Sequence, residues 1–166
     1  MSEEKVDSLK VSEWLVQYLN QVGINYLLIE HGPFHSCADN DLNLQAVDVK
    51  NILLWSRSKK IPVLLVIPCE GRVNFKNLKN YTGIKDLSFA SRDTCIEVLG
   101  AEPGSLSVLG LLYGKKMCKV FIDSSLLDQK LQLHPCDNRK TVVMWFRDLI
   151  YLLNQNTVDF EVIKII

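Results

Sequence analysis

The sequence has no surplus of either charge. Its 166 residues include 19 lysines and arginines and 19 aspartates and glutamates, so the formal net charge is zero. A protein that coats nucleic acid carries a basic surplus, because it must neutralise many phosphates. The neutral balance argues against that class. It does not exclude a protein that grips one end of a nucleic acid through a local cationic site.

Long apolar runs and paired cysteine motifs are also missing. No stretch of 18 apolar residues occurs, so we expect no membrane span. The first residues contain no apolar segment of the secretory type. The cysteines are odd in number and widely spaced, and none forms a C-x-x-C pair. These features predict free thiols in a reducing cytoplasm. The set comprises Cys37, Cys69, Cys95, Cys118 and Cys136.

Several kinds of catalytic and metal site lack their signature. The chain has no P-loop, no G-x-G-x-x-G, no serine elbow and no acid pair of recognisable spacing. His31 and His35 are separated by Gly32 and Pro33, which prevent the helix that would place both imidazoles on one face. Cys136 lies near a histidine, but a thiol nucleophile also needs a neighbour in space that lowers its pKa. We expect no metal and no cofactor.

The pattern of apolar residues predicts one mixed α/β domain over residues 1–166, with residues 1–8 loose. A chain of this length can bury roughly 70% of its unfolded surface, so it needs no disulfide or metal. Helical spacing and glycine stops predict four helices, and apolar runs between turn residues predict strands. The helices are expected over 9–22, 74–82, 92–99 and 147–156, a helical turn over 124–130, and strands over 24–31, 46–56, 61–68, 87–90, 118–123, 141–146 and 159–166.

Lys50 lies within the predicted strand 46–56, on the same face as Asp48, Ile52 and Leu54. If the strand is at the edge of a sheet, the lysine is simply solvated. If the strand is interior, an ammonium is costly there unless it has an anionic partner or an open cleft. The second alternative makes Lys50 a cation that awaits a phosphate or a carboxylate.

Two further segments could form part of a site. In "AEPGSLS", Pro103 and Gly104 specify a tight turn that fixes the directions of backbone amides and carbonyls. The turn could equally be a plain connector. In "HPCDNRKT", His134 is pushed towards an extended conformation by the proline that follows it. That segment could be a surface loop with an incidental histidine.

The order of these segments resembles the YbaK and prolyl-tRNA-synthetase-associated domain family, from about Leu9 to Asn154. The most specific stretch is "LSFASRDTCIEVLGAEPGSLSVLGLL", which has a helix ending at glycine, a Pro-Gly turn, a serine and a Gly-Leu-Leu ending. The pair Lys50-Asn51 and the segment "HPCDNRKTVV" match two other family motifs. The resemblance implies an α+β domain with a mixed, largely antiparallel sheet flanked by helices.

The resemblance also implies a function, which is trans-editing of aminoacyl-tRNA by ester hydrolysis. Alanine on proline tRNA is the first candidate substrate; cysteine on proline tRNA and serine or threonine esters are alternatives. A non-catalytic module that binds tRNA or a synthetase, and a hydrolase of another acyl ester or amide, also remain. Prolyl-tRNA synthetase is an implied partner, and the oligomeric state is open.

In this resemblance Lys50 is the catalytic residue, which engages the terminal adenosine and its phosphate, and His134 lies near the aminoacyl pocket. The remaining implied substrate-binding residues are Asn51, Gly100, Glu102, Pro103, Gly104, Ser105 and Asn138. The chain departs from the family pattern at Cys136, where asparagine or leucine is frequent, and before Lys50, where glycines and a threonine are missing. The tail "DFEVIKII" extends beyond the usual end.

Overall fold

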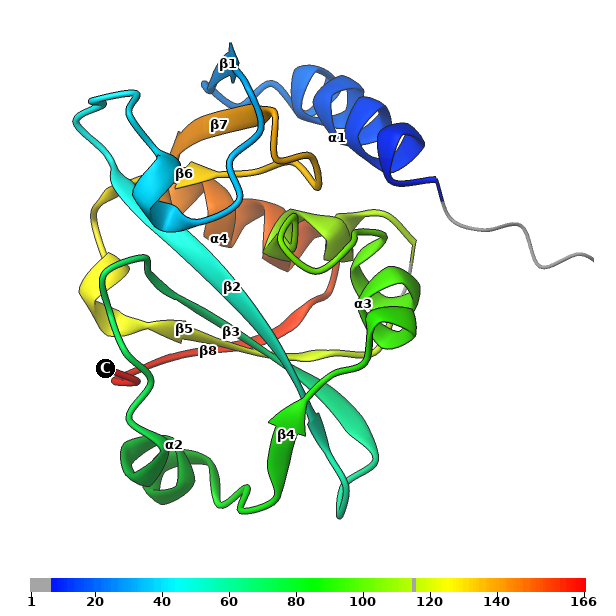
Figure 1. Ribbon diagram of the computed structural model, residues 1–166, viewed down its shortest axis with the longest axis vertical. Helices are drawn as coiled ribbons and strands as arrows, with labels where there is room; N and C mark the ends of the chain where they lie inside the picture. Colours follow the sequence, from blue (N-terminus) through cyan, green and yellow to red (C-terminus); the bar gives the residue numbers. More distant parts are fainter. Residues whose placement is uncertain (1–6, 115) are drawn as a thin grey trace, which may run out of the picture.

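The computed structural model describes residues 7–114 and 116–166, and these form helices packed on a mixed sheet (Figure 1). The helices are α1 (Ser8–Val22), α2 (Phe75–Thr82), α3 (Arg92–Leu99) and α4 (Phe146–Gln155), with 3-10 turns η1 (Cys37–Asp39), η2 (Val108–Leu112) and η3 (Ser124–Leu126). The strands are β1 (Leu27–Glu30), β2 (Val47–Ser56), β3 (Ile61–Pro68), β4 (Leu87–Phe89), β5 (Lys119–Asp123), β6 (Lys130–Leu133), β7 (Lys140–Trp145) and β8 (Asp159–Ile163).

Each predicted helix and strand is present, and the capping residues explain where several of them begin and end. The Ser91 side chain accepts a hydrogen bond from the amide of Thr94 at the start of α3, and Gly100 ends that helix in the left-handed conformation. The prediction of a loose segment over 1–8 falls largely on residues 1–6, outside the described residues. Ser8 is the first residue of α1, and the carboxylate of Asp7 just before it caps the helix through the amide of Leu9.

Three elements were not predicted, namely β6, η1 and η2. The segment predicted as a helical turn over 124–130 is a 3-10 turn only as far as Leu126, and β6 begins at Lys130. Four residues of alternating pattern give too little signal to distinguish a short strand from a loop. β6 is a strand because β7 and β2 pair with it on either side.

The sheet is mixed, with antiparallel pairs in the majority, as the resemblance implied. Its order is β1-β7-β6-β2-β3-β5-β8, and β4 pairs with β2 outside this path. The pairs β2–β6, β3–β5 and β5–β8 are parallel, and the others are antiparallel. Strands β2 and β3 form the expected hairpin around the polar sequence "RSKK".

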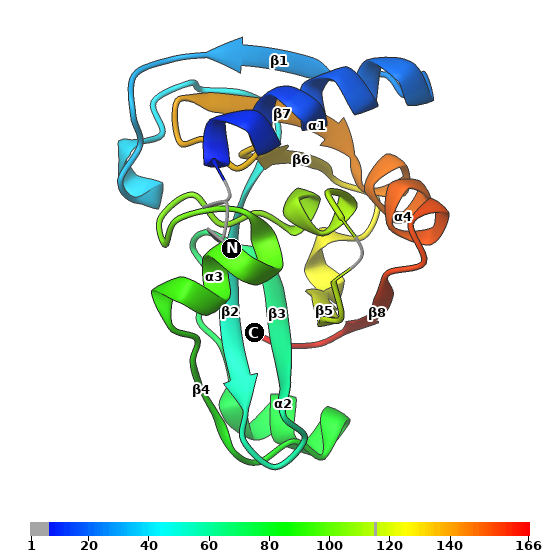
Figure 2. The same ribbon diagram turned by 90° about the vertical axis from the view of Figure 1, so that its right-hand side faces the viewer.

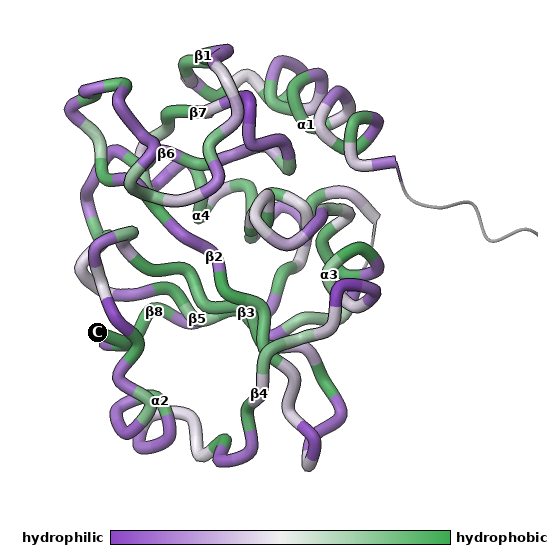
Figure 3. The backbone as a smooth tube through the Cα atoms, in the orientation of Figure 1, coloured by the Kyte–Doolittle hydropathy of each residue, from purple (hydrophilic) through white to green (hydrophobic). Residues whose placement is uncertain are grey.

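Strand β3 is covered on both faces, as its unbroken apolar sequence predicts (Figure 3). Leu64 and Val66 pack into the core that α1, α3, η2 and α4 share. Leu65 and Ile67 face the opposite way, into a smaller core that includes residues of α2 and of the chain end. In both views of the molecule, α2 lies at the end away from α1 (Figures 1 and 2). None of the helices described combines the length and apolar composition that a bilayer crossing requires.

A close approach of backbones joins α3 to η2. A Cβ placed on Gly110 would lie 2.2 Å from the carbonyl oxygen of Leu99, so no other residue fits there without displacing the helix end. Gly110 is the glycine of the Gly-Leu-Leu ending in the sequence. Its role is therefore to let η2 pack directly on the last turn of α3.

Candidate active site

The candidate site lies where β2 changes its neighbour. On one side β2 pairs with β3 from Val49 to Ser56. On the other side β6 pairs only with Val47 and Asp48, and β4 pairs only from Leu54 onwards. Between these two stretches no strand of residues 7–114 or 116–166 pairs with that edge of β2, and Asn51 contacts η2 instead. Lys50 and Asn51 are at this interruption, so the interruption brings their side chains beside the chain that follows α3.

A pocket of about 170 Å³ opens at this interruption. It collects residues from parts of the chain that are far apart in sequence: the loop before β2, the start of β2, the end of β3, the turn after α3 and the end of β6. Predicted residues that line it are Lys50, Asn51, Gly104 and His134; the others are Phe34, His35, Ser36, Cys37, Asn40, Asp48, Val49, Cys69 and Leu106.

Lys50 is half-buried at the pocket and belongs to an interior strand, so the alternative of a solvated edge lysine is wrong. None of the ion pairs found among the described residues includes Lys50. A partly desolvated ammonium without a carboxylate partner gains from an incoming anion, because the anion replaces the hydration that the ammonium has lost. The arrangement suits a phosphate or a carboxylate.

Asn51 holds the pocket wall rather than extending into open space. Its Oδ1 accepts a hydrogen bond of 2.9 Å from the amide of Val108, the first residue of η2. The contact replaces a ladder hydrogen bond at the point where β2 lacks a neighbouring strand. Asn51 therefore fixes the distance between β2 and the turn that carries Gly104.

The turn after α3 contributes fewer groups to the pocket than the sequence predicts. Gly104 lines the pocket, and its φ of +98° requires glycine. The Ser105 amide donates 3.0 Å to the carbonyl of Glu102, so it closes the turn and does not face a ligand. The Glu102 carboxylate pairs with the Arg92 guanidinium. The predicted residues Glu102 and Ser105 do not line the pocket, and neither does the exposed Pro103.

Gly100 is buried below the turn and does not line the pocket. Its φ is +64°, and a Cβ at this position would come within 2.9 Å of the Val11 side chain. The glycine therefore allows α3 to end against α1, which positions the turn from below.

The His134 ring has one nitrogen committed and one without a partner among the described residues. Its Nδ1 lies 2.8 Å from the carbonyl oxygen of Lys140. A carbonyl only accepts hydrogen bonds, so Nδ1 carries the proton, and Nε2 of the neutral ring is an acceptor. Because His134 lines the pocket, this acceptor is available at its wall.

An aromatic cluster at the pocket wall was not predicted. The Phe34 ring stacks on His31 with 3.9 Å between centroids, and both lie 6.1 Å from the His134 ring. Asn138 anchors this cluster: its side-chain amide donates to the Phe34 carbonyl at 3.0 Å, and its own carbonyl accepts from the Phe34 amide at 2.9 Å. Asn138 thus supports the pocket without lining it.

Cys136 is not a nucleophile in this structure. It is 1% exposed, and its Sγ contacts the Leu99 carbonyl at 3.5 Å. Burial raises the pKa of Cys136 to about 12, so the thiol stays protonated at neutral pH. Cys95 and Cys118 are also free and buried.

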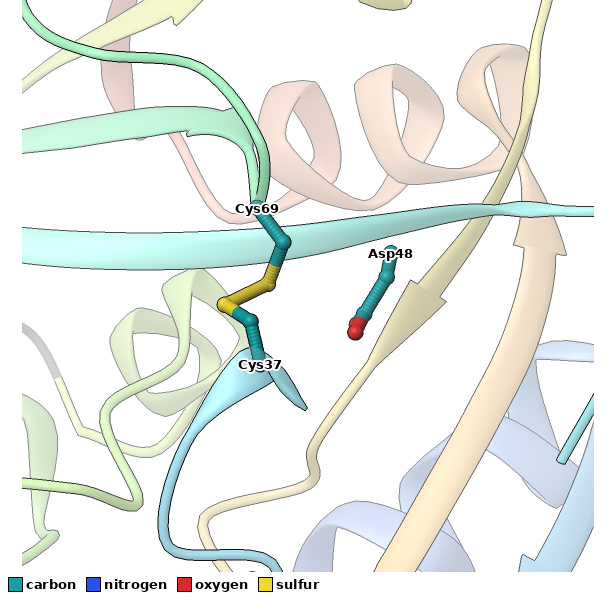
Figure 4. Close-up of side chains that lie close together, drawn as sticks. All are labelled: Cys37, Asp48 and Cys69. Atoms are coloured by element: carbon teal, nitrogen blue, oxygen red, sulfur yellow. A yellow bond between two sulfur atoms is a disulfide. The ribbon is translucent and has the colours of Figure 1, made fainter. Parts of the chain in front are cut away.

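The prediction of free thiols is wrong for Cys37 and Cys69, which form a disulfide (Figure 4). They are 32 residues apart, and only the tertiary fold brings the loop before β2 to the end of β3. A carboxylate oxygen of Asp48 and the two sulfurs lie within 4.8 Å of one another. Because the sulfurs are bonded to each other, this group offers no thiolates to a metal. No other such group occurs in the described ranges, so His31 and His35 do not form one.

Together, the fold and the pocket define an α/β domain that presents a lysine and a histidine acceptor beside a fixed turn. The family model for the aminoacyl-tRNA editing domain matches residues 36–152. The chain belongs to this family, the YbaK-like family that its sequence resembles.

A curated relative and solved structures agree with this membership. The chain is 30% identical over 156 residues to the prolyl-tRNA editing protein ProX of Acetoanaerobium sticklandii, covering 91% of this chain and 95% of that protein. Two crystal structures share the fold at 16% identity. One is of a hypothetical protein (TM-score 0.70; 93% and 97% of the two chains), and the other is of a protein provisionally described as a trans-editing enzyme for prolyl tRNA synthetase (0.69; 93% and 96%).

Proposed function

We propose that this protein is a trans-editing deacylase that hydrolyses the ester of mischarged proline tRNA, with alanine as the amino acid removed. The observation that carries the proposal is the placement of Lys50 in a pocket beside the Gly104 turn and the His134 acceptor, with no carboxylate paired to it in the described part of the chain. Family membership and the name of the Acetoanaerobium sticklandii relative support it. The activity would take place in the cytoplasm, with prolyl-tRNA synthetase as a transient partner.

The roles follow from the chemistry of each group. Lys50 binds the phosphate of the terminal adenosine and so holds the ester in place. The Gly104 amide, for which no partner is found among the described residues, donates to the carbonyl oxygen as negative charge develops there. The Nε2 atom of His134 accepts a hydrogen bond from the amino group of the substrate. An aminoacyl ester is already activated, so positioning of this kind is sufficient without a strong nucleophile.

The Nε2 atom of His134 is engaged by the amino group of the substrate in this scheme, so it does not activate the attacking water. We therefore assign that task to the ribose 2′-hydroxyl of the substrate itself. Selectivity comes from the size of the pocket, which admits alanine and excludes a proline ring. Excluding a larger side chain is easier than rejecting a smaller one, which is why editing sites select by maximum size.

A deacylation panel tests this function. Proline tRNA charged separately with alanine, cysteine, serine and proline is incubated with the wild-type chain, and the loss of each ester is followed. We expect rapid loss of alanine and retention of proline. Preference for cysteine or serine would change the substrate assignment, and no loss of any ester would identify a binding module without catalysis.

Lys50→Ala tests the residue that carries the proposal. We expect deacylation to fall by about 100-fold or more, because the ester is no longer held in place and a misplacement of about 1 Å can cost that much. Lys59→Ala is the matched control, because Lys59 is exposed in the hairpin turn after the same strand. Circular dichroism should show both variants folded. Full activity of Lys50→Ala, or equal losses in both variants, would exclude the assigned role.

A further inference from the structure

We propose that the Cys37–Cys69 disulfide is a redox latch that positions one wall of the pocket and thereby sets how tightly the substrate binds. The inference rests on the proposed function, since its main readout is deacylation. The wall in question consists of residues 34–37 and Asn40, which line the pocket together with Lys50 and Gly104. We call these residues the loop wall.

The loop wall is held at its two ends by hydrogen bonds. At the first end, Phe34 exchanges hydrogen bonds with Asn138. At the second end, the Asn40 side chain donates to Gln132 at 2.8 Å. Both partners belong to the β6–β7 part of the molecule. Neither contact is made to a residue of the strand that carries Lys50; Gln132 links the Asn40 end to that strand indirectly, because it pairs with Asp48.

Between these ends, the hydrogen bonds found are internal to the loop. The Asp39 carboxylate accepts from the amides of His35 and Ser36, and the Asn40 amide donates to the carbonyl of Cys37. These bonds give the loop its shape but do not attach it to the sheet. In the described residues, the disulfide is therefore the tether between the middle of the loop wall and the β2–β3 side (Figure 4).

Cys69, at the other end of the disulfide, is held in place by backbone hydrogen bonds. The Cys69 amide donates 2.8 Å to the carbonyl of Asp48, two residues before Lys50 on β2. The next turn is closed by the Gly71 amide, which donates to the Pro68 carbonyl at 2.9 Å. Because Cys69 is fixed to the strand of Lys50, the bond transmits that position to Cys37. Breaking the disulfide releases the middle of the loop wall, whose ends remain hydrogen-bonded, and leaves Cys69 where it is.

The tether is also accessible to a reductant, in contrast to the other cysteines. Neither Cys37 nor Cys69 is buried, whereas Cys95, Cys118 and Cys136 are. A dithiol reductant attacks one sulfur through its thiolate, forms a mixed disulfide and releases the other cysteine as a thiol. Its second thiol then displaces the remaining cysteine. Two electrons and two protons pass to the protein, and the reductant becomes a disulfide.

A preorganised wall lowers the entropy lost on binding, so the latch should act on KM more than on kcat. The chain is assayed against alanine-charged proline tRNA after oxidation and after reduction with dithiothreitol, with a chelator keeping metal ions from the two thiols and Asp48. We expect reduction to raise KM roughly fivefold, the lower range of measured site couplings, with kcat changed less than about twofold. Re-oxidation with oxidised glutathione should restore the KM of the oxidised protein.

Variants separate the latch from a general effect of thiols. Cys37→Ser and Cys69→Ser should show the higher KM, that of the protein without the disulfide, under both oxidising and reducing conditions. Cys95→Ala, which removes a buried free thiol, should respond to reduction as the wild type does. An equal KM in the two states, or a Cys37→Ser variant that behaves like the oxidised protein, would overturn the proposal.

Hydrogen exchange gives a readout that does not depend on activity. Reduction should speed amide exchange over residues 35–40 and leave η2 unchanged. If no tRNA is deacylated in either state but this exchange difference appears, the proposed function fails and the latch remains. If deacylation proceeds and the exchange over the loop wall does not change, the latch fails and the function remains.

Discussion

At the scale of single residues, His134 and Cys136 show how two neighbours in one segment differ in chemistry. The His134 ring reaches the pocket with a proton fixed on Nδ1 by the Lys140 carbonyl. Cys136 turns inwards, in a left-handed conformation with φ of 59°, and contacts the end of α3. Only the histidine can meet a substrate, although both lie close to the same proline in the sequence.

Cys136→Ala should therefore leave deacylation within about twofold of the wild type, because a thiol with its pKa raised to about 12 supplies no thiolate at neutral pH. Initial rates with alanine-charged proline tRNA measure this. Mass spectrometry after iodoacetamide treatment of the native protein should find Cys136 unmodified. A loss of 100-fold in rate with an intact fold would restore the thiol nucleophile that the structure argues against.

At the scale of elements, one side-chain hydrogen bond links β2 to η2 beside the pocket. Asn51→Ala leaves the amide of Val108, a fully buried residue, without its acceptor. A buried unsatisfied donor costs about 1–3 kcal/mol, so we expect the free energy of unfolding to fall by that amount and activity to fall with it. Urea unfolding measures the first quantity.

Asn51→Asp is the matched control for that change, since a carboxylate oxygen can still accept from Val108. It should retain more of the stability than Asn51→Ala. Equal urea midpoints for the wild type and Asn51→Ala would show that η2 does not depend on this hydrogen bond.

The elements also show which parts of the architecture are encoded locally. Both ends of helix α3 could be predicted to the residue, because the signals lie next to them in the sequence: Ser91 caps the start and Gly100 ends the helix. Lys50 and His134 could be identified by family resemblance. Their meeting in one pocket depends on β6 pairing with β2, and no local signal specifies that. The disulfide was missed for the same reason, and the Phe34 cluster lies in a segment without periodicity.

At the scale of the whole molecule, a buried carboxylate ties the last residues to the sheet. Asp123, at the end of β5, is 1% exposed and accepts hydrogen bonds from the amides of Ile165 and Ile166 at 2.7 and 3.1 Å. Burial raises its pKa, but the hydrogen bonds from Ser125, Ile165 and Ile166 more than offset this, and the pKa lies below 3.8.

The free energy of unfolding should depend on the ionisation of the Asp123 carboxylate. Because the pKa is lower in the folded state, the stabilisation is complete above about pH 4 and is lost as the pH falls through the folded value. Asp123→Asn should cost about 2 kcal/mol at neutral pH, the usual value of hydrogen bonds to a charged group. The difference from the wild type should shrink towards pH 2, as measured by urea unfolding.

Asp41→Asn provides the comparison, since Asp41 is an exposed carboxylate. It should change the free energy of unfolding by less than about 0.5 kcal/mol at either pH. If Asp123→Asn showed the same small change, the carboxylate would not hold the chain end.

The pairing of β2 with β6 extends over only two residue pairs, Val47 with Leu131 and Asp48 with Gln132, and it is the ladder that joins the two halves of the sheet. Any rocking of one half against the other must therefore bend the backbone close to Lys50. Lys50 lies two residues beyond this short ladder on β2. Such a motion of the two halves would consequently widen or narrow the pocket around the Lys50 side chain, and no separate lid would be needed.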